Sequence, residues 1–89
     1  MNLKDYEDEL RERIEQNNVS WEMWCDHYNN TVVVEITWGD WKHDHLFCDY
    51  LVESFLKEKG FTQIDRAENV TDSDGSDCYS AIHYYTIRR

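Results

Sequence analysis

Two histidines and a cysteine that lie close together in the chain, His43, His45 and Cys48, are the side chains best suited to chemistry. Imidazole and thiolate are usual zinc ligands, and His45 and Cys48 would share one face of a helix because they are three residues apart. A structural zinc site needs four ligands, and Cys25 and His27 would supply a second pair only if the fold brought them near. A zinc-stabilised domain is therefore one hypothesis. The simpler interpretation is that the histidines are polar residues at a helix start and that Cys48 is packed in the core.

A second candidate is the acidic run Asp72-Ser73-Asp74-Gly75-Ser76-Asp77, which looks like part of an EF-hand calcium loop. If Gly75 takes the glycine position of that loop, the first and last ligand positions fall on Val70 and Ala81, whose side chains bind no cation. An acidic turn between two strands is the better interpretation. We expect neither a metal nor any other cofactor to be required.

Cysteine, histidine and carboxylate side chains are all present, yet no nucleophile is placed on a strained turn or at a helix N-terminus beside a base. Three glycines in 89 residues also exclude a glycine-rich phosphate loop. His83 could pair with a carboxylate, but a lone histidine in a strand is more often structural. We therefore expect no enzymatic activity.

The strongest global property is charge, because 19 acidic and 9 basic residues give a net charge of −10. Nucleic acid and anionic membrane surfaces would be repelled, so direct binding to either is not expected. Long-range attraction favours a basic protein partner instead, and a chain this acidic can imitate the phosphate rows of a nucleic acid. The polar N-terminal segment, the lack of a long apolar run and the odd number of cysteines predict a cytoplasmic protein with reduced thiols.

Hydrophobic periodicity predicts two helices. The first covers residues 2–17 and has a narrow apolar stripe on an otherwise charged surface. The second has its helical pattern over residues 46–59 and presents a wide apolar face. Asp40 is a candidate N-cap for this second helix, and Gly60 supplies its left-handed end.

Two hairpins complete the chain. Residues 20–38 form the first, turned at Asn29-Asn30, and residues 61–69 and 77–88 form the strands of the second. The element order is therefore α-β-β-α-β-β. The predicted fold class is α+β, a single domain over residues 1–89 in which both helices pack on one face of a four-stranded antiparallel sheet.

A turn at Asn29-Asn30 would place Cys25 opposite Val34 and Met23 opposite Ile36. The alternation then gives the first hairpin one core face, made of Trp21, Met23, Cys25, Val32, Val34, Ile36 and Trp38. The other face is mixed and carries two aromatic residues. In the last strand both alternating sets contain aromatic residues, so either could be buried.

Exposed aromatic residues dominate protein–protein hot spots, and carboxylates beside them would suit a basic groove on another protein. The predicted partner-binding residues combine the two kinds: Trp24, Tyr28, Trp41, Glu12, Asp44, Asp49, Glu53, Asp72, Asp74 and Asp77.

In size, acidity, lack of a catalytic motif and α+β character, the chain is similar to small phage or mobile-element proteins that block host defence, including anti-CRISPR and anti-restriction DNA mimics. The likeness is one of kind and implies no role for any individual residue. It favours a non-enzymatic inhibitor that occupies a basic nucleic-acid-binding site on a host defence or nucleic-acid-handling protein, in the host cytoplasm if the protein is phage-encoded. The alternative is a small homodimeric interaction module of another process, so the chain is expected to be a monomer or a homodimer.

Overall fold

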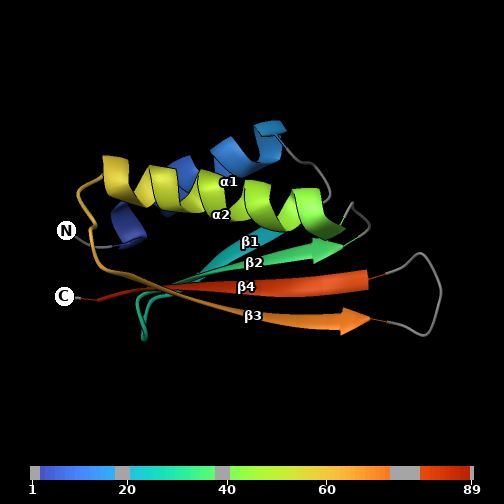
Figure 1. The fold of residues 1–89 in the computed structure, drawn as a ribbon. Coiled ribbons are helices and arrows are strands. Elements are labelled where there is room, and N and C mark those ends of the chain that lie inside the picture. Colours follow the sequence, from blue (N-terminus) through green and yellow to red (C-terminus); the bar gives the residue numbers. More distant parts are fainter. Residues whose placement is uncertain (1–2, 18–20, 38–40, 73–78, 89) are drawn as a thin grey trace.

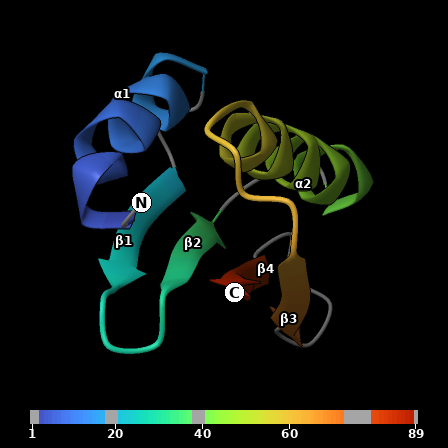
Figure 2. The same ribbon diagram turned by 90° about the vertical axis from the view of Figure 1, so that its left-hand side faces the viewer.

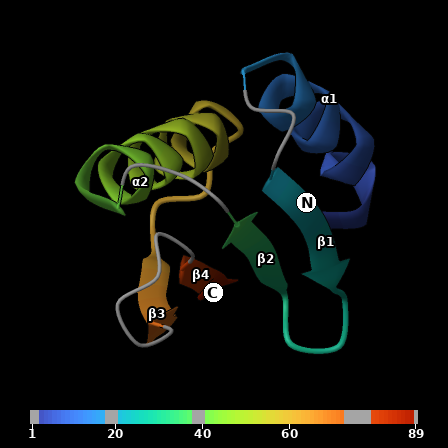
Figure 3. The same cartoon turned by 90° about the vertical axis from the view of Figure 1, so that its right-hand side faces the viewer.

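Two helices lie together over one face of an antiparallel sheet, as the side views in Figures 2 and 3 show. The computed structural model describes residues 3–17, 21–37, 41–72 and 79–88. The elements in chain order are a 3-10 turn Leu3–Asp5, α1 Glu7–Asn17, β1 Trp21–Asp26, β2 Thr31–Thr37, α2 Trp41–Glu58, β3 Ile64–Asp72 and β4 Tyr79–Ile87 (Figure 1). The predicted fold class and element order are confirmed.

The first helix differs from the prediction at its start, whereas the second agrees with it. The first is divided into the short 3-10 turn and α1, whose acidic first turn suits the positive end of the helix dipole. The second begins at Trp41, the position that follows the candidate cap Asp40, and it includes His45 ahead of the clear apolar pattern that starts at Leu46. Its end is as expected, because Gly60 has a positive φ of 97° and Phe61 N donates to Leu56 O at 2.9 Å. The candidate cap Asp40 lies outside the described residues.

The sheet has the strand order β1-β2-β4-β3, so β4 is inserted between β2 and β3, the two strands that α2 connects. This is a split β-α-β arrangement, and it leaves β1 and β3 at the edges. None of the described helices combines the length and the apolar character needed to cross a membrane.

The predicted register of the first hairpin is wrong by two residues. Cys25 pairs with Val32 rather than with Val34, because the turn spans residues 27–30 instead of Asn29-Asn30 alone. Asp26 stabilises this longer turn, since its side chain accepts hydrogen bonds from the backbone N–H groups of the second and third residues after it. A shift of two keeps every described side chain on its predicted face, and Trp38 lies outside the described residues.

The core lies between the helices and the inner face of the sheet. Its buried members come from every element except β3: Leu3, Leu10, Ile14, Trp21, Met23, Val32, Val34, Ile36, Cys48, Leu51, Val52, Phe55, Leu56 and Tyr85. In β4 the buried set is Ala81, His83 and Tyr85, which decides the face that the sequence left open. By contrast, residues 65–70 of β3 are all exposed.

Candidate functional site

An apolar row crosses the outer face of the sheet, the face that the described helices do not cover. Cross-strand pairing aligns Trp24 with Val33, Val33 with Tyr84, and Tyr84 with Ala67, one residue from each strand. Trp24 is 41% exposed, whereas Val33 is only 5% exposed. Val33 lies between Trp24 and Tyr84, its cross-strand neighbours on this face.

Carboxylates border this row. Glu22 of β1 is paired directly with Glu35 of β2. Glu22 is two residues before Trp24 along β1, so both side chains lie on the outer face. Side chains that stand opposite each other on antiparallel strands have their Cβ atoms about 5 Å apart. Within the described part of the chain, no basic side chain forms an ion pair with either carboxylate. We call the apolar row together with Glu22 and Glu35 the outer-face patch.

The other predicted aromatic anchors are placed differently. Tyr28 lies in the turn beyond this patch and is 94% exposed. Trp41 is the first residue of α2, but its side chain lies outside the description.

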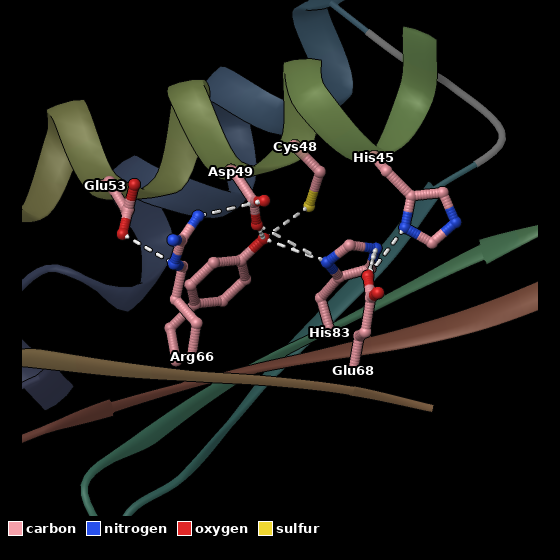
Figure 4. Close-up of polar contacts among 8 residues, drawn as sticks. His45, Cys48, Asp49, Glu53, Arg66, Glu68 and His83 are labelled. Carbon is pink, nitrogen blue, oxygen red and sulfur yellow. Dashed lines mark hydrogen bonds and ion pairs between the residues drawn. The ribbon is translucent and has the colours of Figure 1, made fainter. Parts of the chain in front are cut away.

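The predicted acidic row on α2 is largely engaged within the protein (Figure 4). Arg66 of β3 binds both Asp49 and Glu53, each at 3.2 Å. Asp44 is half-buried and also has a contact. By contrast, Glu12 is exposed on α1.

The predicted acidic turn mostly falls outside the described residues. Asp72 ends β3, with its side chain outside the description, and Asp74 and Asp77 belong to the segment that is not described at all.

Beneath α2 lies a buried polar cluster that joins the helix to β4 (Figure 4). The Tyr85 hydroxyl donates to Asp49 Oδ1 at 2.7 Å. The same hydroxyl lies 3.1 Å from Cys48 Sγ and 3.3 Å from His83 Nδ1. His83 Nδ1 is also 3.5 Å from Asp49 Oδ1. The Tyr85 hydroxyl is therefore the centre of the cluster, in contact with a carboxylate, a thiol and an imidazole.

Burial sets the protonation of these groups. It raises the pKa of the Cys48 thiol to about 12 and raises that of the Tyr85 phenol as well. Burial also lowers the pKa of His83, and the nearby charge of His45 acts in the same direction. The thiol is therefore protonated at neutral pH and lacks the thiolate that a cysteine nucleophile requires.

A histidine pair and a carboxylate meet at the other end of this cluster. His45 of α2, Glu68 of β3 and His83 of β4 each place one possible ligand atom within 4.8 Å of the others. Within the described residues this is the only group of three or more such side chains at metal-binding spacing. It shares only His45 with the predicted set, since the Cys48 thiol contacts Tyr85 and the His43 side chain lies outside the description.

The second ligand pair considered from the sequence does not join this group. His27 Nε2 lies 2.8 Å from Glu7 Oε2 of α1, on another part of the molecule. Glu68 was not predicted as a ligand, because its only signal is the strand register, which pairs Glu68 with His83. An open groove of about 480 Å³ leads to this place along the edge strand; its lining residues are Asp49, Ile64, Asp65, Arg66, Ala67, Glu68 and His83.

Comparisons with models of known protein families, with curated proteins and with solved structures found no match.

Proposed function

We propose that the protein is a non-enzymatic acidic binding protein that occupies a basic nucleic-acid-binding groove on another protein through its outer-face patch. The observation that carries the proposal is the pairing of Glu22 with Glu35 beside the exposed Trp24. The mode of action is competition, in which carboxylates take the place of phosphates at Arg and Lys side chains of the partner. This is the action expected from the likeness to small anti-restriction and anti-CRISPR proteins.

The arrangement of charge supports a cationic partner. Like charges directly opposite each other on a sheet destabilise the free protein, by roughly 0.2–1 kcal/mol on the scale of cross-strand pairs. A basic side chain placed between Glu22 and Glu35 would replace this repulsion with attraction. The surrounding net charge of −10 would speed the encounter, and salt would weaken it.

The arrangement of aromatic residues supports a protein partner rather than a diffuse ion atmosphere. Trp24 projects from a rigid strand, and tryptophan is among the side chains most often found at hot spots. The Trp24–Val33–Tyr84 row offers a desolvated centre, with Glu22 and Glu35 at its rim. Such a centre with a charged border is the usual anatomy of a protein interface.

The homodimeric module remains the second candidate, because the exposed edge strand β3 is a template for pairing. Stacking two copies through their outer faces would bring Glu22 and Glu35 of both copies together in a complex of doubled negative charge. Light scattering measures this directly: a monomer supports the inhibitor, and a dimer supports the module.

Affinity capture from a bacterial lysate at low and high salt tests the proposal. We expect a nuclease or another nucleic-acid-binding protein at low salt and its loss at high salt. The variant Glu22→Lys/Glu35→Lys should abolish capture. The control Asp5→Lys/Asp8→Lys changes the net charge equally on exposed positions of the N-terminal helical segment, and it should retain capture. Recovery of the bait alone, or equal loss in both variants, would contradict docking through this face.

A further inference from the structure

The side chains of His45, Glu68 and His83 converge from three different elements on one point beside the edge of the sheet (Figure 4). His45 Nδ1 lies 2.9 Å from Glu68 Oε2, at hydrogen-bond distance. His83 Nε2 lies 3.9 Å from the same oxygen, which is beyond hydrogen-bond range. The Glu68 carboxylate oxygen is therefore close to both imidazoles but within hydrogen-bond distance of only His45.

His83 is the informative member of this group. Its side chain is only 2% exposed, and its buried Nε2 has no hydrogen-bond partner among the residues that the structure describes. Buried polar groups are nearly always satisfied, so an imidazole nitrogen left open toward a second imidazole and a carboxylate requires an explanation. A metal ion bound between the three side chains supplies one.

We propose that His45 Nδ1, Glu68 Oε2 and His83 Nε2 bind one divalent transition-metal ion. Metal–ligand bonds of about 2.0–2.2 Å place two ligands of one ion roughly 3–4 Å apart. The 2.9 and 3.9 Å separations to Glu68 Oε2 fall within or next to this range. The two most distant ligand atoms must move closer by on the order of 1 Å to reach this separation. Rotation of the long, half-exposed Glu68 side chain helps to provide this movement.

The surroundings of His83 match those of a metal-bound histidine. Ligating histidines usually offer their other ring nitrogen to a carboxylate or a similar acceptor, which fixes the orientation of the ring. His83 Nδ1 lies 3.5 Å from Asp49 Oδ1 and 3.3 Å from the Tyr85 hydroxyl. Asp49 is held in turn by Arg66. The Asp49–Tyr85 pair would thus orient His83 Nε2 toward the ion.

The ligand types select the metal. Two imidazoles and one carboxylate suit Zn²⁺ and other first-row divalent ions, whereas Mg²⁺ and Ca²⁺ prefer sites made entirely of oxygen. Three protein ligands leave a coordination position for water. The groove along β3, which is lined by both Glu68 and His83, gives the ion and this water a path from solvent.

Binding would join α2 to β3 and β4. The edge strand β3 contributes little buried surface, and its described polar links to α2 are the ion pairs of Arg66 and the His45–Glu68 contact. A metal ion would add a cross-link between this strand and α2. Metal should therefore raise the melting temperature and slow amide hydrogen exchange in β3 more than in β1.

The test uses the full chain, stripped of metal with a chelator and kept reduced. Zn²⁺ is titrated by calorimetry, and Co²⁺ by visible absorption. We expect one equivalent of either ion to bind, with millimolar Mg²⁺ unable to compete. A cobalt spectrum without a thiolate charge-transfer band is expected, because no cysteine is in the ligand set. Absence of saturable binding, or a thiolate band, would overturn the proposal.

Substitutions then assign the ligands. Glu68→Gln keeps the size of a half-exposed side chain, so the variant should fold, and we expect its affinity for Zn²⁺ to fall at least tenfold. The matched control Asp65→Asn removes a carboxylate from the outer face of the same strand and should bind within twofold of the unmodified protein. Equal affinities of Glu68→Gln and Asp65→Asn would overturn the assignment. Capture of a basic partner should be unchanged in Glu68→Gln, so the failure of this proposal and the failure of the proposed function are distinguishable.

Discussion

Glu22 and Glu35 lie directly opposite each other on neighbouring strands, on the outer face of the sheet. Glu22 is two residues before Trp24 along β1. We expect this pairing to destabilise the free protein and, under the proposed function, to favour a cationic partner. Glu22→Gln should therefore stabilise the free protein by about 0.2–1 kcal/mol while weakening partner binding. Urea unfolding measures the first effect, and Glu12→Gln on the exposed side of α1 is the control. A destabilised Glu22→Gln variant would show that the pair is not repulsive.

The Tyr85 hydroxyl connects β4 to Asp49 on α2. Tyr85→Phe removes this donor and leaves a partly buried carboxylate with one hydrogen bond fewer, so we expect a loss of about 1–3 kcal/mol in the free energy of unfolding. Tyr84→Phe, on the outer face of the same strand, should change it by less than about 0.5 kcal/mol. Chemical denaturation compares the two. Equal losses would show that the buried hydroxyl contributes nothing specific.

Glu7 on α1 makes stability depend on acid. Burial raises the pKa of this carboxyl, but hydrogen bonds from His27 and Arg11, with their charges, outweigh burial and lower the pKa below its ordinary 4.5. Because the pKa is lower in the folded than in the unfolded protein, the stabilisation is complete above about pH 4.5 and is lost as the pH falls through the folded value. Unfolding free energies measured between about pH 6 and pH 3 should fall less steeply for Glu7→Gln. Parallel profiles for the two proteins would contradict this account.

The two described cysteines should be inert while the protein is folded. Burial raises the pKa of Cys25 and of Cys48 to about 12, so the thiolate that reacts with alkylating agents is scarce at neutral pH. In a Cys78→Ser background, iodoacetamide should modify both thiols slowly in the native protein and rapidly in urea, as followed by mass spectrometry. Rapid labelling of Cys48 under native conditions would mean that α2 separates readily from β4.

The sequence predicted the elements and the core face of the first hairpin because both depend on local periodicity. An error of two residues in the turn does not change the face on which the side chains from Trp21 to Cys25 lie, since side-chain direction repeats every two positions along a strand. The exact pairing depends on Asp26, whose side chain favours a longer turn than the asparagine pair suggested.

The site was less predictable because it depends on distant contacts. The meeting of Glu68 with His45 and His83 requires the register of β3 against β4 and the position of α2 above both strands. Which face of β4 is buried was likewise decided by the helices, since both of its faces carry aromatic residues. The sequence suggests that Asp49 and Glu53 are surface charges, yet both form ion pairs with Arg66, which is distant in the chain and belongs to β3.

Docking in a nucleic-acid-binding groove is tested by competition, using the protein recovered by affinity capture. Its affinity for its own DNA or RNA is measured at increasing concentrations of this protein and of Trp24→Ala. We expect the apparent dissociation constant for nucleic acid to rise linearly with added protein, and Trp24→Ala to need at least tenfold higher concentration for the same effect. A ternary complex, in which the captured protein binds nucleic acid and this protein together with unchanged affinity, would contradict docking in this groove.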